Sequence, residues 1–376
     1  MKQDAVPAGA TGVITIDLGQ LGANWQALAK LVHPAQCGAV VKANAYGLGA
    51  DRVVPALARA GCRTFFIATA TEAHAARRLV PSATLFALDG LLPGAGSDLR
   101  RAGAVPVLSS LAEVREWASL VEGQAEKVPT ALHVDTGLNR LGMPEHEVEE
   151  LVRDSRILDR LDVRLVMSHL VSADDPEDPR NERQLAAFER LRGRLPRAPA
   201  SLAASDGLML GARYHFDLVR PGYALYGGQA FRGGPTPVGP VVRVSARILQ
   251  IRDVAPGETV GYSASWRARR ASRVAVVAAG YADGLPRSLS APDGHAGGMI
   301  AIRGRPAPIV GRVSMDLITV DVTELGDLAL ERGELVDLIG PGLTIEAMGS
   351  AAGTIGYEVL TRLGPRFPRV YVDEAG

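Results

Sequence analysis

The stretch "AVVKANAYGLG", Ala39–Gly49, begins as an apolar run, reaches a lysine at position 42 and continues to a tyrosine and two glycines. An uninterrupted apolar run is typical of a parallel strand buried on both faces, and the glycines beyond it predict a turn. Lys42 at the end of this strand has two interpretations. It is a surface residue whose stem packs along the strand, or it is an amine held in a pocket as a nucleophile or base.

The alternation of strand and helix continues from about Gly38 to Gly227. The strand candidates are "GAVVKANAY", "TFFIAT", "ATLFAL", "VPVLSS", "TALHVDTG", "RLVMSHL", "PASLAAS" and "HFDLVRPG". Amphipathic segments between them predict helices and include "ADRVVPALARAG", "TEAHAARRLV", "LAEVREWASLVEG", "HEVEELVRD" and "NERQLAAFERLRGRL". Eight strand-then-helix units in about 190 residues predict an α/β fold, a (β/α)8 TIM-like barrel rather than an open doubly wound sheet.

A second, mainly β domain is predicted after "GGPTPVGP", Gly233–Pro240. Segments such as "VVRVSARILQIRDV", "RVAVVAAGY", "MIAIRG" and "LITVDV" alternate apolar and polar residues between turn sequences. We therefore place the barrel in residues 1–235 and the β domain in residues 236–376. The early strand-like "GVITIDL", residues 12–18, precedes the barrel repeat and could pair with the β domain instead.

The composition argues against several classes of protein. Lys and Arg total 41, as do Asp and Glu, so no net charge draws the chain to nucleic acid or to an acidic membrane. The sequence contains neither an HExxH pair nor a GxxxxGK[ST] loop, which argues against metal hydrolases and P-loop proteins and predicts no metal site. Two cysteines without metal-type spacing, no signal-peptide pattern and no membrane-length apolar run predict a cytoplasmic protein.

Polar residues gather at the ends of the last two predicted barrel strands, where reactive groups of barrels cluster. Ser205 ends the seventh strand, and Arg220, Gly222 and Tyr223 follow the eighth. The backbone N–H groups of Gly222 and Tyr223 can point at an anion, and these two loops bind phosphate in many barrels. The alternative is an ordinary loop with a proline turn.

Arg140 and His169 also follow predicted strands. Arg140 could instead pair with Asp135, and His169 could be a core histidine with satisfied hydrogen bonds. A lysine, a phosphate cradle, two arginines and a histidine at one barrel mouth fit a phosphorylated carbonyl cofactor. Pyridoxal 5'-phosphate is the candidate, because it needs a lysine for its aldehyde, donors for its phosphate and a partner for its ring nitrogen.

Several motifs resemble those of the alanine racemase family, in family order and across nearly the whole chain. They are "VVKANAYGLG", "HVDTGLNRLG", "VRPGYALYG", "VGYSASW", "AAGYADGLPR", "GRVSMD" and "IGYEVLTRLGPRFPRVY". The resemblance implies a homodimeric isomerase that interconverts L-alanine and D-alanine with pyridoxal phosphate, for peptidoglycan synthesis or for alanine catabolism. The alternatives are a racemase of broader or larger amino-acid specificity, a related barrel decarboxylase and a non-catalytic pyridoxal-phosphate-binding protein.

The resemblance also implies roles for individual residues. Lys42 would form the internal aldimine and act as one acid/base, and Tyr262, supplied by the other subunit, would be the second. The expected cofactor contacts are Lys42, Tyr46, Arg140, His169, Ser205, Arg220, Gly222, Tyr223 and Tyr357, with Arg220 facing the pyridine nitrogen. The expected substrate contacts are Arg140, Met315 and Tyr281, and an access corridor would be lined by Tyr281, Asp174, Arg287, Arg312 and Ile355.

Taken singly, the second-domain residues have simpler interpretations. Tyrosines such as Tyr262, Tyr281 and Tyr357 are favoured in strands for packing, and Met315 alone would be a core residue. The ordered motifs favour the functional interpretation over these.

Three positions depart from the family pattern. His133 stands where many members carry a lysine that braces the active-site arginine, which leaves open how Arg140 is held. Ser201 replaces a histidine common behind the ring-nitrogen arginine, so Arg220 could be positioned differently. Ala204 replaces a frequent asparagine before the phosphate serine.

Inversion at Cα requires a proton removed from one face and another delivered to the opposite face. One lysine cannot readily serve both faces of a fixed planar adduct, so two positioned acid/base groups are expected. Tyrosines crowding the mouth predict a small substrate and a clear preference for alanine.

Overall fold

The computed structural model describes residue 7 and residues 9–123, 126–295 and 297–373. The N-terminal segment for which no signal peptide is predicted lies partly outside these residues. The chain divides into two compact units, which we call the barrel unit, Leu21–Gly239, and the β unit, which joins the segment up to Gln20 with the segment from Pro240. The predicted fold class, an α/β barrel followed by a mainly β domain, is confirmed.

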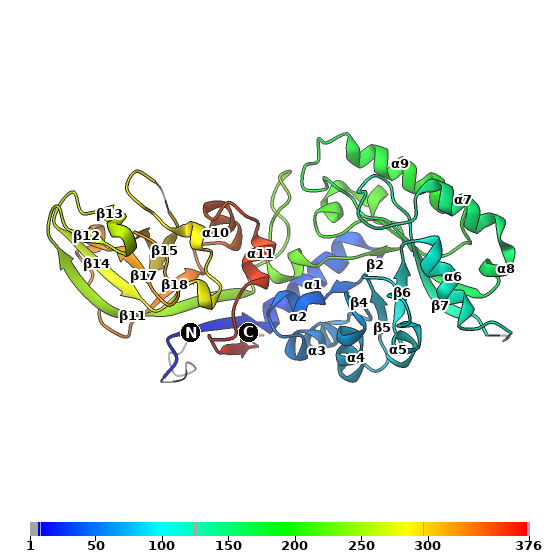
Figure 1. Cartoon of the computed structure of the whole chain (residues 1–376), viewed down its shortest axis with the longest axis horizontal. Helices are drawn as coiled ribbons and strands as arrows, with labels where there is room; N and C mark the ends of the chain where they lie inside the picture. The colour runs from blue at the N-terminus through cyan, green and yellow to red at the C-terminus, as the bar shows by residue number, and fades with distance from the viewer. Residues whose placement is uncertain (1–6, 8, 124–125, 296, 374–376) are drawn as a thin grey trace. The chain divides into compact units, whose positions relative to one another are not determined.

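The barrel unit contains a parallel sheet whose strands follow one another in chain order (Figure 1). Its seven strands are β3 (Ala39–Val40), β4 (Thr64–Ile67), β5 (Thr84–Ala87), β6 (Val105–Leu108), β7 (Val128–His133), β8 (Leu161–Met167) and β9 (Ala200–Ser201). Each lies within one of the strand candidates or overlaps it. Their inner residues are apolar and buried, as in β4, where Phe65, Phe66 and Ile67 are all buried.

An eighth strand, β10 (Leu218–Val219), closes the ring. It pairs in parallel with β2 (Gln36–Cys37), which directly precedes β3. On its other side the N–H of Arg220 donates to the carbonyl of Ala203 at 3.0 Å, next to β9. The last strand of the predicted order thus lies between the first strands and β9, as a closed barrel requires.

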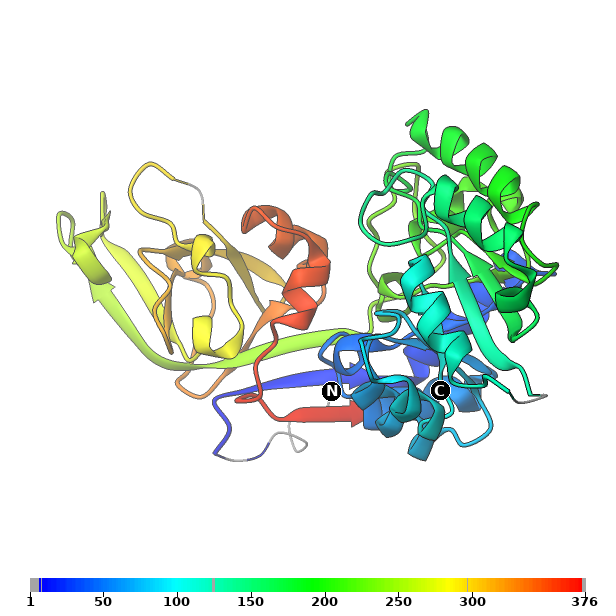
Figure 2. The ribbon, with the colours of Figure 1, turned by 45° about the vertical axis from the view of Figure 1, so that its right-hand side comes forward.

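Helices separate most of the barrel strands, and Figure 2 shows them around the sheet. They are α1 (Leu18–Val32), α2 (Lys42–Tyr46), α3 (Ala50–Ala60), α4 (Ala70–Leu79), α5 (Gly96–Arg101), α6 (Leu111–Ser119), α7 (Glu145–Arg153), α8 (Ser155–Leu158) and α9 (Arg180–Arg192). After β9 and β10 the chain forms only short 3-10 helices, η2 (Asp206–Leu210), η3 (Ala212–Tyr214) and η4 (Tyr223–Tyr226). The expected full helix after every strand is therefore wrong for the last two units.

The β unit is built on a mixed sheet of eight strands in the order β14-β17-β16-β15-β18-β11-β1-β19. Their bounds are β1 (Gly12–Asp17), β11 (Val242–Val254), β14 (Ser272–Val277), β15 (Met299–Ile302), β16 (Arg305–Val310), β17 (Ile318–Asp321), β18 (Leu335–Ile339) and β19 (Arg369–Val372). The strand β1, whose assignment the sequence left open, pairs antiparallel with β11 and parallel with β19.

Short elements carry the loops of the β unit. They are the hairpin strands β12 (Thr259–Val260) and β13 (Trp266–Arg267), the helices α10 (Ile345–Ala351) and α11 (Gly356–Thr361), and the 3-10 turns η5 (Tyr262–Ala264), η6 (Tyr281–Asp283), η7 (Arg287–Leu289) and η8 (Thr323–Leu325). Among the described residues of both units, none of the helices has the length and apolar character needed to cross a bilayer.

Candidate active site

The strand β3 ends in a left-handed helical turn. The sequence predicts a strand up to Tyr46, but the strand ends at Val40, and α2 begins at Lys42. Ala43, Asn44 and Ala45 have φ of 52–54°, and Tyr46 has φ of 55°. Left-handed backbone costs roughly 1–2 kcal/mol for each residue with a Cβ. Such strain persists only where surrounding contacts fix it, and it is concentrated at functional sites.

Local hydrogen bonds fix the end of this turn. The N–H of Gly47 donates to the carbonyl of Ala43 at 2.8 Å, and Gly47 has φ of 84°, which glycine adopts freely. The side chain of Asn44 accepts from the N–H of Ala50 at 2.8 Å, at the start of α3. The turn thus presents Lys42, which is partly buried, at the carboxyl end of its strand.

A cradle of donors lies at the ends of β9 and β10. The buried Oγ of Ser205 accepts from the N–H of Gly222 at 3.0 Å and from the N–H of Ala224 at 3.2 Å. A Cβ added to Gly222 would lie 2.3 Å from the hydroxyl of Tyr46, so only glycine fits there. Burial raises the pKa of Tyr46 to about 12, which keeps its phenol protonated and able to donate. The structure therefore brings together Tyr46, Ser205 and Gly222, with Tyr223 buried next in the chain.

Arg220 is 3% exposed and is held by acceptors at the carboxyl ends of β8 and β9. Its Nη1 donates to Oγ of Ser201 at 2.5 Å, and its Nη2 donates to the carbonyl of Ser168 at 2.7 Å. Burial lowers the pKa of Arg220 to about 9, so the guanidinium still carries its charge at neutral pH. Ser201, where a histidine is common in the family pattern, thus contacts the arginine directly.

His169 is half-buried beside this guanidinium. Its Nδ1 lies 3.4 Å from Nη2 of Arg220, and because arginine can only donate, Nδ1 acts as the acceptor. Burial, followed by the positive charges of Arg220, Arg140 and Lys42, lowers the pKa of His169 to about 3. His169 is therefore neutral at neutral pH.

Arg140 lies exposed in the loop after β7. The sequence left open a pairing with Asp135, but Oδ1 of Asp135 accepts from the backbone N–H groups of Gly137, Leu138 and Asn139 at 2.9–3.2 Å. The carboxylate therefore shapes the loop that presents the arginine.

His133 lies behind this loop and is buried. Its Nδ1 is 3.2 Å from Oγ of Ser109, within hydrogen-bonding distance. Burial and the charge of Arg220 lower its pKa to about 4, so this histidine is also neutral at neutral pH. It supplies no negative charge that could brace Arg140.

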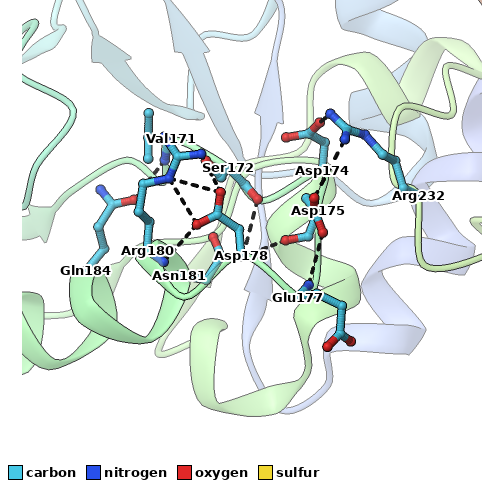
Figure 3. Close-up of polar contacts among 10 residues, drawn as sticks. All are labelled: Val171, Ser172, Asp174, Asp175, Glu177, Asp178, Arg180, Asn181, Gln184 and Arg232. Carbon is cyan, nitrogen blue, oxygen red and sulfur yellow. Dashed lines mark hydrogen bonds and ion pairs between the residues drawn. The ribbon is translucent and has the colours of Figure 1, made fainter.

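Asp174 follows β8 in an acidic loop (Figure 3). Its Oδ2 lies 2.6 Å from Nη2 of Arg232, and its carbonyl accepts from the N–H of the same arginine at 2.8 Å. Asp174 is thus tied to the segment after η4 by both side chain and backbone.

The predicted second-domain residues lie on loops of the β unit, and several are unusually exposed. The exposed fractions are 72% for Tyr262, 63% for Ile355, 54% for Met315 and 42% for Tyr281. None of these four side chains is therefore packed as a core residue of its own unit.

Tyr262 sits at the tip of the β12–β13 hairpin, in the turn η5. Its neighbours Gly261, Ser263 and Ala264 have positive φ values of 79°, 61° and 47°. With 72% of its surface exposed in this turn, Tyr262 is not the packed strand residue of the alternative interpretation.

Tyr281 and Met315 lie where two loops cross. The N–H of Tyr281 donates to the carbonyl of Ser314 at 3.1 Å, and that of Ala282 donates to the carbonyl of Met315 at 3.0 Å. A Cβ on Gly280 would lie 2.2 Å from the carbonyl oxygen of Met315, so glycine permits the crossing.

The remaining predicted residues of the β unit occupy separate elements. Arg287 begins η7 and Arg312 follows β16, and both are exposed. Tyr357 lies in α11, partly buried, directly after Gly356, and Ile355 is the N-cap of this helix.

Two residues that hold the backbone of the site are not among those predicted from the sequence. Gln184 of α9 donates to the carbonyl of His169 at 3.0 Å and to Thr136 Oγ1 at 3.1 Å. It also accepts from the N–H of Val171 at 2.8 Å (Figure 3). Glu72 of α4 accepts from the N–H that follows Lys42. Gln184 left no sequence signal, whereas "TATEA", with a threonine three residues before the glutamate, is a helix-start pattern that could have identified Glu72.

Comparison with known proteins gives the same order of domains. The family model of the alanine racemase N-terminal domain matches residues 16–230, and that of the C-terminal domain matches residues 241–371. The chain belongs to the alanine racemase family. The alanine racemase of Methylobacterium sp. (strain 4-46) is 49% identical over 360 residues, which cover 96% of this chain and 97% of that protein. The alanine racemase of Brucella canis is 45% identical, with 99% and 96% covered.

Solved structures of alanine racemases are also similar. The structure from Bartonella henselae, with covalently bound pyridoxal phosphate, has a TM-score of 0.91 and 40% identity and covers 96% of this chain and all of its own. The biosynthetic alanine racemase from Pseudomonas aeruginosa has a TM-score of 0.88 and 33% identity, with 96% and 99% covered.

Proposed function

We propose that this chain is an alanine racemase, an isomerase that interconverts L-alanine and D-alanine with pyridoxal 5'-phosphate as cofactor. The observation that carries the proposal is the similarity to alanine racemases across both domains, at 49% identity over nearly the whole of both chains. The residues at the barrel mouth are of the kinds that this chemistry requires.

The barrel mouth fits a phosphorylated aldehyde. Because Oγ of Ser205 accepts two N–H bonds, its own proton is left to donate to a phosphate oxygen. The phenol of Tyr46 lies beside Gly222, where a larger residue would displace it. We assign these groups and Tyr223 to the phosphate, with Tyr357 completing the set, and Lys42 to the covalent attachment.

The cofactor supplies an aldehyde that condenses with amino groups and a ring that withdraws charge from Cα. Lys42 takes or returns the Cα proton on one face, and a second group is needed on the other. Tyr262 is that group. Its exposure in its own unit, together with that of Met315, supports its contribution to the site of a second subunit in a homodimer.

Arg220, His169 and Arg140 set the charge of the site. Arg220 can only donate, so it disfavours a proton on a ring nitrogen placed opposite it and limits charge withdrawal to what proton transfer needs. His169 is neutral beside it. Arg140 is exposed, and the carboxylate in its own loop, that of Asp135, is occupied by backbone N–H groups. We therefore assign Arg140 to the carboxylate of the substrate.

The corridor residues select for size and charge. We assign the access path to Tyr281, Asp174, Arg287, Arg312 and Ile355, with Tyr281 and Met315 also touching substrate. The biological role of the reaction is either the supply of D-alanine for peptidoglycan or the catabolism of alanine.

An exchange assay tests the activity. The purified protein with pyridoxal phosphate is incubated with each alanine enantiomer in deuterated water, and both enantiomers and Cα deuterium are measured. We expect racemisation from either side, and loss of about 1,000-fold or more in Lys42→Ala and Tyr262→Phe. Absence of exchange in the wild-type protein, or full activity of Lys42→Ala, would exclude the proposal.

Subunit mixing tests the shared site. Lys42→Ala and Tyr262→Phe chains are each inactive, but a mixed dimer has one site with both native residues if each site draws on two chains. Random mixing should then restore about a quarter of the wild-type activity. If both residues of a site came from one chain, mixing would restore nothing.

A further inference from the structure

Glu72, in the first turn of α4, connects two loops with one carboxylate. Its Oε1 accepts from the N–H of Ala43 at 2.7 Å, and its Oε2 accepts from the N–H of Ala68 at 2.7 Å. Ala43 directly follows Lys42, and Ala68 directly follows β4. The carboxylate thus bridges the turn that carries the lysine and the neighbouring strand of the barrel.

The position of this carboxylate is itself fixed. Thr69 is the N-cap of α4, and its Oγ1 accepts from the N–H of Glu72 at 3.2 Å. A negative charge in the first turn of a helix is also stabilised by the helix dipole. Glu72 is partly buried, and its bond to the N–H of Ala68 is partly buried as well, whereas its bond to the N–H of Ala43 is exposed.

The N–H of Ala43 reports the direction of the peptide plane that joins it to Lys42. This plane is rigid, so an acceptor that fixes the N–H restricts the ψ angle of Lys42 and with it the orientation of the Cα–Cβ bond of Lys42 relative to the turn. The first N–H groups of any helix lack a partner within the helix. In this turn the backbone is also left-handed from Ala43 onward, so an external acceptor opposes relaxation to an ordinary conformation.

A similar bond elsewhere in the barrel provides a comparison. Glu147 of α7 accepts from the N–H of Leu111 with Oε2 at 2.8 Å, at the start of α6. It also joins neighbouring units of the barrel through a carboxylate in the first turn of a helix. The loop that Glu147 holds carries none of the proposed site residues. Removing this bond therefore measures what such a contact contributes to stability alone.

We propose that Glu72 is a positioning residue, which holds the turn after Lys42 so that the lysine amine is aimed at the cofactor aldehyde. This inference rests on the proposed function for the identity of the cofactor. The arrangement of the turn does not depend on it.

The experiment compares Glu72→Gln with Glu147→Gln in the full-length protein. Glutamine keeps the size of the side chain and one acceptor, but its amide nitrogen cannot accept from the second N–H. Hydrogen–deuterium exchange of peptides covering residues 42–47, without cofactor, reports the turn itself. We expect about tenfold faster exchange in Glu72→Gln and an unchanged rate in Glu147→Gln.

Pyridoxal phosphate titration reports the lysine. Absorbance at about 420 nm follows attachment to Lys42. We expect the Kd for pyridoxal phosphate to rise about tenfold or more in Glu72→Gln and less than about twofold in Glu147→Gln. Racemisation should show a lower kcat with little change in KM, since the substrate carboxylate contacts are untouched. Glu72→Asp, which keeps the charge but is shorter, is the second variant if glutamine prevents folding, and it should show the same pattern.

The outcomes separate this proposal from the proposed function. Unchanged exchange of the 42–47 peptides in both Glu72 variants, or equal loss of pyridoxal phosphate affinity in Glu72→Gln and Glu147→Gln, would overturn the positioning role. A wild-type protein that attaches pyridoxal phosphate but does not racemise alanine would instead contradict the proposed function, and the exchange and titration results would still decide the role of Glu72.

Discussion

The hydroxyl of Ser201 links Arg220 to the strand that carries it. It accepts from Nη1 of Arg220 at 2.5 Å and donates to the carbonyl of Leu218, in β10, at 2.5 Å. The guanidinium is therefore positioned by a small hydroxyl and by the carbonyl of Ser168 at 2.7 Å. The imidazole that is common in the family at the position of Ser201 is therefore not required to hold Arg220.

Ser201→Ala should leave the buried Arg220 short of one acceptor. A buried donor without a partner costs about 1–3 kcal/mol, more when the donor is charged, so the free energy of unfolding should fall by at least that much in urea. Ser119→Ala removes an exposed hydroxyl bond to the carbonyl of Glu116 and should change stability by less than about 0.5 kcal/mol. Equal effects of the two variants would show that the Ser201 contact contributes little.

Gln184→Ala should destabilise the loop after β8. It deletes two donated bonds and one accepted bond, all at a side chain that is only 3% exposed. We expect the free energy of unfolding to fall by about 3 kcal/mol, and we expect a smaller effect on cofactor binding beside His169. Gln26→Ala, on the exposed face of α1, should be neutral within about 0.5 kcal/mol. A neutral result for Gln184→Ala in urea unfolding would contradict this.

His133 makes stability depend on pH. Its folded pKa of about 4 lies below the unfolded value of about 6.5, so the unfolded chain binds more protons between these values. Stability therefore falls as the pH is lowered from about 6.5 to about 4 and is unaffected by this group above that window. Between pH 7 and pH 5 the loss should be about 2 kcal/mol.

The variant His133→Asn isolates this effect. Asparagine keeps a polar contact to Ser109 but does not titrate, so the fall in unfolding free energy between pH 7 and pH 5 should shrink by about that amount. The measurement is urea unfolding at both pH values. A variant with the same pH dependence as the wild type would assign the effect to other groups.

Gly280→Ala should disturb the crossing that holds Tyr281 and Met315. The added Cβ would meet the carbonyl oxygen of Met315 at 2.2 Å, which backbone atoms can relieve only by moving. Overpacking of this kind costs about 1–3 kcal/mol, and the KM for alanine should rise because both loops shift. Gly326→Ala is the control, since its Cβ would meet the nearest atom at 3.4 Å and its φ is −58°. A stable variant with normal kinetics would separate this crossing from the site.

Much of the fold follows from the sequence because its determinants are local. Strand candidates of six to nine residues, several of them largely apolar, overlap all eight barrel strands, and the change to alternating patterns after Gly233 indicated the mainly β domain. The ends of the strands then placed Lys42, Ser205 and Arg220 at one mouth. Their contacts with Ser201 and Gly222 could not be derived, because they depend on side-chain positions brought together by ring closure.

The left-handed turn was missed for a different reason. Its residues Ala43, Asn44, Ala45 and Tyr46 have no strong preference for positive φ, apart from Asn44, so tertiary contacts determine it. Glu72, which accepts from the N–H of Ala43 in this turn, lies on α4, 29 residues along the chain. Gln184, which holds the loop after β8 instead, lies on α9. The motif order indicated the roles of exposed residues such as Tyr262, for which periodicity favoured a packed strand.

The position of β1 has a consequence for how the chain is made. Gly12 faces Ala246 in the sheet, so the first strand leaves the ribosome long before its partner is synthesised. The barrel unit is continuous in sequence and can fold during this interval. We therefore expect arrested chains ending near Gly239 to hold a protease-resistant barrel with a cleavable N-terminal strand, which becomes protected only after β11 and β19 emerge.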